Sequence, residues 1–170
     1  GNPTSILSGG GDIVLMNNSV ASAGLFNMVS AVSTMVNAGG GNLTVLGTAT
    51  QGGGISGLGI NGLITFTTTG AGNISISGTS ANWWGIAIGN TFGGSANPMI
   101  YTVCGAAPTC GSITLTGTTN APGVGAGADP TGLGVYSGSG AVYSDKANIF
   151  LNGSATVANP AALAIQARSG

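Results

Sequence analysis

Apolar and polar residues alternate in five short segments of this 170-residue chain. In GNISI, at residues 72–76, one Ser separates the two Ile residues, and related segments begin near residues 11, 41, 111 and 147. Such alternation is typical of a β-strand that buries one face, because successive side chains point to opposite sides. The segment starts are 30, 31, 39 and 36 residues apart, so we interpret the chain as five repeats.

Two further apolar elements follow each segment. The second element lies 12 residues after the first apolar residue in three repeats and further along in the last two. The residues that mark this second element are Leu25, Ile55, Ile86, Leu133 and Leu163. A third patch, such as STMV at 33–36, precedes the next repeat, and the Gly- and Pro-rich stretch 121–130 is typical of a loop. Each repeat is therefore predicted to contain three short strands.

Strands this short cannot bury an apolar face within a single repeat. Stacking solves the problem, because each strand can pair in parallel with its equivalent in the next repeat, about 4.8 Å away. The sequence thus predicts an all-β fold, a parallel β-helix (β-solenoid) of about five coils with 30–39 residues per coil, in one domain covering residues 1–170. The alternative is a Gly-rich β-sandwich whose repeats arose by chance.

One polar residue precedes the first strand of every repeat. These residues are Asp12, Asn42, Asn73, Ser112 and Asn148. Stacked repeats would place them in one column at a corner, where their amides and hydroxyls could bond to the turn backbone or to one another.

The composition restricts what such a fold could do. Charged residues make up 3% of the chain, His is absent, and the net charge is −1, whereas soluble domains contain about 25% charged residues. Binding to nucleic acid or to an anionic membrane surface therefore has no electrostatic basis. The chain also has no run of about 18 apolar residues, which argues against membrane insertion.

The ionisable residues are too few and too scattered to predict catalysis. Parallel β-helices include enzymes that act on polysaccharides, but such chemistry needs paired carboxylates, or a base with a metal. The acidic residues here are Asp12, Asp129 and Asp145, and the last is followed by Lys146 in what we expect to be an exposed turn. We therefore expect no enzymatic activity, no cofactor and no metal site.

The two cysteines, Cys104 and Cys110, enclose the short stretch GAAPT. Their spacing does not match a zinc site, and the chain has no His to complete one. A local disulfide is the favoured interpretation, and it would stabilise the fold by about 2–3 kcal/mol. Two reduced thiols in a turn are the alternative. A disulfide would also favour an extracellular location.

Aromatic and Thr residues suggest two binding surfaces. Trp83 and Trp84 are adjacent, so on a strand one would pack while the other is exposed to stack on a sugar or to form an interface with Phe92. The alternative is that both Trp side chains fill a corner. The Thr-rich stretches TFTTTG and ITLTGTT could form an ice-binding face only if their Thr side chains stack, and their irregular register in the sequence argues against this.

The repeats, exemplified by GNISISGTS with GIAI and by GSITLTGTT with GLGVYS, resemble those of filamentous haemagglutinin-like bacterial exoproteins. The resemblance covers roughly residues 9–167 and implies a right-handed β-helix exported to the cell surface, with an adhesive role and no catalytic residues. Members of that family usually contain many more coils. We therefore expect either an excised segment or a subunit that continues the solenoid by stacking.

The predicted ends of the solenoid favour such continuation. Uncapped ends expose unpaired strand edges and core, and the stretches GNPTSILSGG and AALAIQARSG contain no polar cap. The expected function is non-catalytic: a segment or subunit of an extracellular surface fibre or biofilm matrix. Its partners would be flanking repeats or further copies joined end to end, and surface glycans are a further candidate. The alternative is a carbohydrate-binding or, with less support, an ice-binding module.

Overall fold

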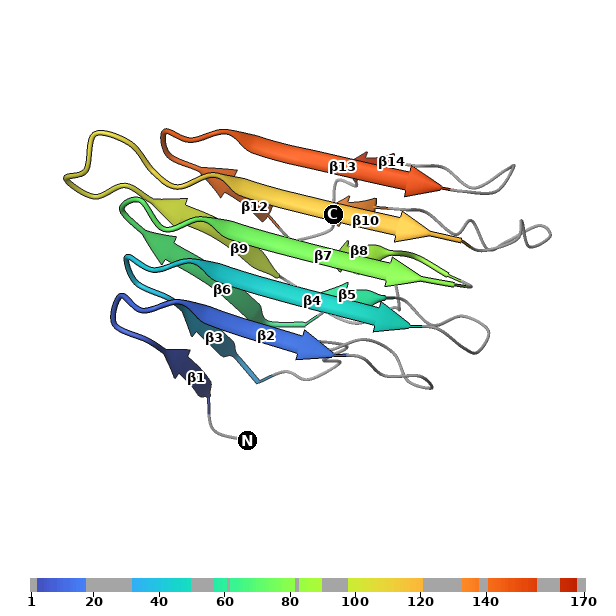
Figure 1. The fold of residues 1–170 in the computed structure, drawn as a ribbon, viewed down its shortest axis with the longest axis horizontal. Helices are drawn as coiled ribbons and strands as arrows, with labels where there is room; N and C mark the ends of the chain where they lie inside the picture. The colour runs from blue at the N-terminus through green and yellow to red at the C-terminus, as the bar shows by residue number, and fades with distance from the viewer. Residues whose placement is uncertain are drawn as a thin grey trace.

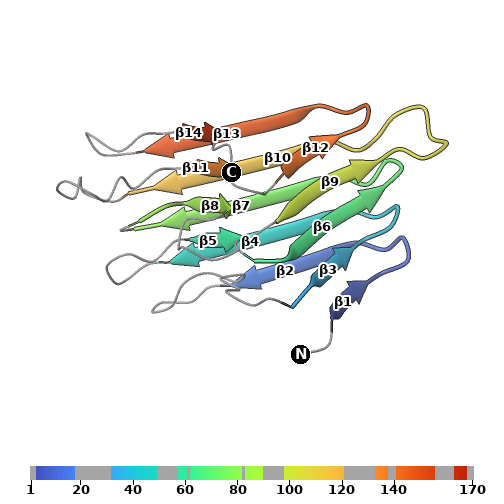
Figure 2. The same ribbon diagram turned by 180° about the vertical axis from the view of Figure 1, so that it is seen from behind.

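The strands of this chain lie side by side in parallel sheets (Figures 1 and 2). The structure is a computed structural model that describes residues 3–17, 32–49, 57–60, 62–81, 83–89, 98–120, 133–137, 141–155 and 163–167. Within these ranges the regular secondary structure is entirely β-strand, with no helix. The predicted all-β fold with parallel sheets is therefore confirmed, and the arrangement is consistent with a β-solenoid.

Three sheets contain the strands, and each sheet takes equivalent strands from successive repeats. Sheet 1 consists, in spatial order, of β1 (Thr4–Leu7), β3 (Thr34–Asn37), β6 (Ile64–Thr69), β9 (Met99–Val103) and β12 (Ala141–Ser144). Sheet 2 consists of β2 (Ile13–Asn17), β4 (Leu43–Ala49), β7 (Ile74–Ser80), β10 (Ile113–Thr119) and β13 (Ile149–Ala155). Sheet 3 consists of β5 (Leu58–Ile60), β8 (Ile86–Gly89), β11 (Leu133–Ser137) and β14 (Leu163–Ala167).

The pairing between repeats is in register along whole strands. Leu43 pairs with Ile74, which pairs with Ile113, and that residue pairs with Ile149. The five segments recognised from their alternation are therefore the five strands of sheet 2. The third apolar patches of the sequence likewise form β3, β6, β9 and β12 of sheet 1.

Two details differ from the expectation. In the second repeat the residue that pairs with Ile86 is Leu58, three residues after the Ile55 that the 12-residue offset singled out. Residues 25 and 55 lie outside the described ranges. In addition, β1 precedes the first recognised repeat and pairs in parallel with β3, so the regular structure begins earlier than predicted. A fixed offset fails because the loops between strands differ in length, while pairing aligns only the strands.

The core runs along the inside of the three sheets as columns of aliphatic side chains. On β4, β7 and β10 every second residue is buried, and the residues between them are half-buried and point outward. Fully buried core residues include Val45, Ile76 and Leu115 from sheet 2, with Phe66 from sheet 1 and Ile88 from sheet 3. Each such side chain contributes about 1.5–3 kcal/mol by leaving water.

Glycine is required at two places in the repeat. The turn that leads from sheet 1 to sheet 2 has a left-handed residue at Gly39, Gly70 and Gly105, with φ values of 59°, 59° and 56°, a conformation that Gly adopts at no steric cost. On sheet 2 the reason is different, because a Cβ at Gly47 or Gly78 would overlap the carbonyl oxygen of the residue just before sheet 3 begins. Sheet 3 therefore approaches sheet 2 closely at this position.

We predict that Gly78→Ala destabilises the fold by about 1–3 kcal/mol, the usual range for overpacking. Its new methyl group would overlap the carbonyl oxygen of Gly85, which is held in place because it accepts a hydrogen bond of 2.9 Å from the Leu58 N–H. Urea unfolding would measure the change. The adjacent outward substitution Ser77→Ala is the control and should change stability by less than about 0.5 kcal/mol. Equal stability of the two variants would contradict this packing account.

Candidate functional site

The predicted polar corner column is a directional ladder of hydrogen bonds. Asp12 Oδ1 accepts from the backbone N–H of Asn42 at 2.7 Å and from its Nδ2 at 3.2 Å. Asn42 Oδ1 accepts in the same way from Asn73, at 3.0 Å for both atoms. Asn73 Oδ1 accepts from the N–H of Ser112 at 2.9 Å and from its hydroxyl at 3.1 Å. Each step joins one repeat to the next, so the ladder supports the stacking of repeats.

The fifth member of the column, Asn148, occupies the equivalent position without extending the side-chain ladder. Its backbone carbonyl accepts from the N–H of Ile113 at 3.1 Å, as the earlier members do for theirs. No side-chain hydrogen bond joins Asn148 to Ser112 or to another residue of the described ranges. The side chain is exposed, so its amide oxygen is an open acceptor at the end of the ladder.

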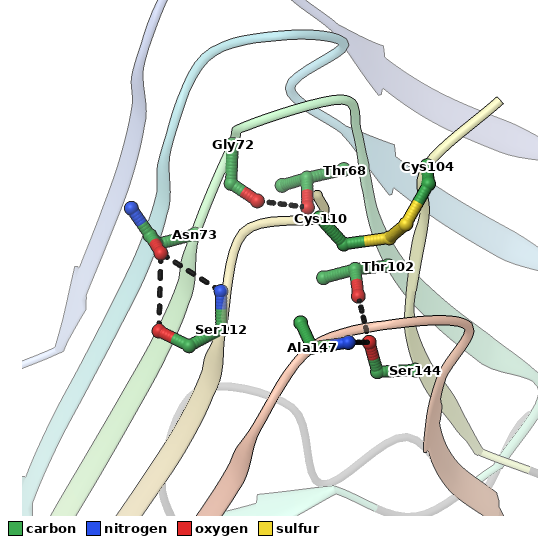
Figure 3. Close-up of a disulfide and its surroundings, with 9 residues drawn as sticks. All are labelled: Thr68, Gly72, Asn73, Thr102, Cys104, Cys110, Ser112, Ser144 and Ala147. Atoms are coloured by element: carbon green, nitrogen blue, oxygen red, sulfur yellow. Dashed lines mark hydrogen bonds between the residues drawn. A yellow bond between two sulfur atoms is a disulfide. The ribbon is translucent and has the colours of Figure 1, made fainter. Parts of the chain in front are cut away.

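A disulfide joins Cys104 to Cys110 in the turn between β9 and β10, as the spacing favoured (Figure 3). The two Cα atoms lie 4.6 Å apart, within the usual range for a disulfide. The Cys104 side chain is buried, and the residues between the cysteines include exposed positions. The bond closes the turn that connects sheet 1 to sheet 2 in the third repeat.

A second polar column, which was not predicted from the sequence, lies inside the same turns. Thr68 Oγ1 donates to the Gly72 carbonyl at 2.6 Å, and Thr102 Oγ1 donates to Ser144 Oγ at 2.8 Å (Figure 3). Ser144 Oγ also accepts from the N–H of Ala147 at 3.1 Å. Each hydroxyl follows an inward apolar residue by two positions, a signal that the alternating pattern contained. These side chains satisfy turn backbone groups that the sheets leave unpaired.

Trp83 and Trp84 lie in the bend before β8, not on a strand. Their rings contact each other, with centroids 5.4 Å apart and an interplanar angle of 39°, and both side chains are half-buried. The expectation that one packs while the other is exposed is therefore wrong, because alternation applies to strands and not to bends. The Trp83 Nε1 atom is buried without a partner in the described chain, and Phe92 lies outside the described residues.

The outward positions of the three inner strands of sheet 2 carry eight hydroxyl groups and one Leu side chain. These residues are Thr44, Leu46 and Thr48 on β4, Ser75, Ser77 and Thr79 on β7, and Thr114, Thr116 and Thr118 on β10. The three strands pair in phase, but the Thr-rich stretches TFTTTG and ITLTGTT lie in different sheets, on β6 and β10, so these two stretches do not stack on one another. None of these hydroxyls forms a hydrogen bond with another residue of the described ranges.

Ionisable groups do not gather anywhere in the described part of the chain. Asp145 and Lys146 are exposed in the turn between β12 and β13, as expected. Within the same ranges, no three His, Cys, Asp or Glu residues lie close enough together to hold a metal ion. No helix there is long and apolar enough to span a membrane. The features available for function are therefore the hydroxyl face, the polar ladder and the ends of the sheets.

Comparisons with protein families, with curated proteins and with solved structures find no match to this chain. The class of protein is therefore defined by the fold itself: an all-β chain whose repeats contribute equivalent strands to three parallel sheets.

We predict that removing one step of the ladder weakens the stacking of repeats. Asn73→Ala leaves the N–H and hydroxyl of Ser112 without their acceptor and should lower the free energy of unfolding by about 1 kcal/mol. Asn73→Asp keeps the acceptor for Ser112 but replaces Nδ2, which donates to Asn42 Oδ1, with a second oxygen, so it should also lose stability. Chemical denaturation would rank the variants, with Asn152→Ala, an exposed amide outside the ladder, as the control. A loss at Asn152 as large as that at Asn73 would contradict a specific role for the ladder.

Proposed function

We propose that this chain is a right-handed parallel β-helix of about five coils and a non-catalytic segment or subunit of an extracellular fibre on a bacterial surface. Its role would be mechanical or adhesive. In this proposal the solenoid continues beyond both ends, through flanking repeats of a longer chain or through further copies. Handedness and family rest on the resemblance of the repeats to filamentous haemagglutinin-like exoproteins.

The observation that carries the proposal is the contrast between inner and terminal repeats. Ile113 and Ile149 occupy the same inward column, yet Ile113 is fully buried while Ile149 is 38% exposed. At the opposite end, Ile6 is 41% exposed although its equivalent Val36 is fully buried. At the β1–β2 end the exposed core residue is Ile6 of sheet 1, whereas Ile13 of sheet 2 is 8% exposed. An exposed core residue at each end is what a segment within a longer rod would present, since solenoid proteins that stop in water need polar caps.

The remaining features agree with an extracellular structural role. A disulfide closes one turn, and disulfides persist mainly outside the reducing cytosol. With 3% charged residues, the rod depends on backbone pairing and burial, which salt and pH affect little because few groups titrate and few ion pairs exist to be screened. No clustered acids or bases in the described ranges support catalysis.

Immunogold labelling tests the location and the role. Antibodies raised against the 170-residue chain should label intact cells that produce it, along fibres or matrix outside the envelope. Labelling should not increase when the cells are permeabilised. An antibody against a cytosolic protein serves as the control, since it should label only permeabilised cells. Label that appears only after permeabilisation would overturn the proposed extracellular function.

The hydroxyl face of sheet 2 supports ice binding as a second candidate function. Apart from the position of Leu46, its hydroxyls repeat about every 4.8 Å between strands and about every 6.6 Å along each strand, and they are free of partners in the described chain. A rigid grid of this kind can offer many hydrogen bonds at once to a ligand that is itself periodic, such as the surface of ice. The carbohydrate alternative lacks equal support, because Trp83 and Trp84 pack on each other.

For this second candidate, we expect the chain to slow ice recrystallisation in a sucrose solution held below freezing. Thr116→Tyr places a ring on β10 between Thr114 and Thr118 and beside Ser77, which would hold the ice plane away from these hydroxyls and abolish the effect. Thr65→Tyr, on the outward face of sheet 1, is the matched control and should remain active. Ice growth unaffected by the unsubstituted chain would exclude this function.

A further inference from the structure

The exposed large apolar side chains of the described residues concentrate at the two ends of the sheets. At the end formed by β1 and β2 they are Ile6, Leu7, Val14 and Met16. At the end formed by β12 and β13 they are Tyr143, Ile149 and Phe150. Met35, which is 40% exposed on β3, is the remaining member. Figures 1 and 2 show these two ends as the first and last layers of the stack.

Two outward columns change character at these ends. Val14 and Phe150, which are 59% and 48% exposed, share a column whose inner members are Thr44, Ser75 and Thr114. An exposed Ile at an end is expected when the inward-facing core is simply cut off there. That reason does not apply to the outward column of Val14 and Phe150, which carries hydroxyl residues inside the stack and apolar residues at both ends. Burial against another surface at the ends explains this pattern.

The second column shows the same change. Leu7, which is 64% exposed, is followed along its column by Asn37 and Thr67, while the other end of the column is Tyr101 and Tyr143. The two Tyr rings stack at 5.2 Å with an interplanar angle of 14°, so Tyr101 covers one face of Tyr143. Among the described strands, β12 is the last of sheet 1, so none of them covers the other face.

We propose that the β1–β2 end of one copy docks on the β12–β13 end of another, in the same register that joins the repeats within the chain. This inference deepens the proposed function and rests on it, by identifying a second copy as the partner. Continuing each column across the junction places Val14 on Phe150 and Leu7 on Tyr143. It also places Ile6 on Val142 and Ile149 on Ile13, which covers the two exposed core residues Ile6 and Ile149; Ile13 is already buried in the single chain.

Polar groups at the junction are complementary in the same register. Within the chain, the first residue of each sheet 2 strand donates its N–H to the carbonyl that precedes the next strand, for example Ile74 to Ser112 at 2.9 Å. By the same rule, the N–H of Ile149 in one copy donates to the Asp12 carbonyl of the next copy across the junction. The free amide oxygen of Asn148 then accepts from the Asp12 N–H, which adds one step to the ladder.

A second copy is the occupant that fits both ends. Asp12 lies in the turn before β2, and both Asp145 and Lys146 lie in the equivalent turn before β13, so charge gives no net preference at the junction. An unrelated partner would have to match strand register and apolar columns at each end, whereas the chain already carries both halves. The contact joins two different surfaces, so repeated docking forms a filament.

Two substitutions test the apolar contacts without altering the repeat. Val14→Thr and Phe150→Ser install residues that inner repeats carry in the same column, so each variant should fold. The 170-residue chain should form filaments that lengthen with concentration, seen by light scattering and negative-stain microscopy. Each variant should raise the concentration needed for assembly at least tenfold. Met35→Thr, an exposed apolar position away from the ends, is the matched control and should assemble like the unsubstituted chain.

Cysteine crosslinking tests the register. The double variant Val14→Cys with Phe150→Cys places the two new thiols opposite each other across the junction, where a disulfide can form. Oxidation should then produce a ladder of covalent oligomers on a non-reducing gel. The control pairs Val14→Cys with Asn152→Cys, two residues out of register, and should produce far less of this ladder.

The outcomes separate this inference from the proposed function. A chain that stays monomeric at the highest soluble concentration, or equal crosslinking by the two cysteine pairs, overturns head-to-tail docking in this register. Surface labelling of cells would still support the extracellular role, with flanking repeats as the continuation. In contrast, filaments and register-specific crosslinks combined with purely internal labelling would support docking and overturn the extracellular location.

Discussion

In-register parallel pairing of equivalent strands is the interaction on which the rest of this structure depends. Leu43, Ile74 and Ile113 pair directly, so residues at the same position of successive repeats stack in a column. All members of one column therefore have similar surroundings. Aliphatic residues fill most inward columns, since a buried polar side chain needs a hydrogen-bond partner, which Thr68 and Thr102 find in the turns. The same constraint turns the residue before each sheet 2 strand into a ladder, since side chains that share a column lie within hydrogen-bonding reach.

The pairing tolerates large differences in repeat length because the extra residues lie in the connections. The third repeat starts 39 residues before the fourth, yet β7 and β10 pair along all seven residues of each strand. Part of the added length is the turn that Cys104 and Cys110 close. The disulfide removes conformational freedom from the unfolded turn, which offsets the larger entropy cost of ordering a longer connection.

Columns explain both what the sequence predicted and what it did not. The strands of sheet 2 were predictable because alternation and a preceding Gly or Ala mark every copy, and the corner polar residues followed from their fixed position before the strand. The second element was harder: Leu58 replaces Ile55 as the partner of Ile86 because a count along the chain includes loop residues that pairing ignores. The Trp pair was placed wrongly since a bend has no alternation, and Thr68 was missed because its bond to the Gly72 carbonyl depends on the turn's path.

A protein with 3% charged residues has little electrostatic repulsion to prevent association on its sides. The outward columns limit association on the sides in a different way. Ser75 and Thr114 present hydroxyls that stay hydrogen-bonded to water, so covering the side of sheet 2 with another molecule would remove few apolar groups from solvent. Val14 and Phe150 reverse this balance at the ends of the same column. Association along the axis therefore buries apolar surface and also extends backbone pairing, whereas lateral association does neither. The distribution of hydroxyl and apolar residues within one column thus favours growth in a single direction.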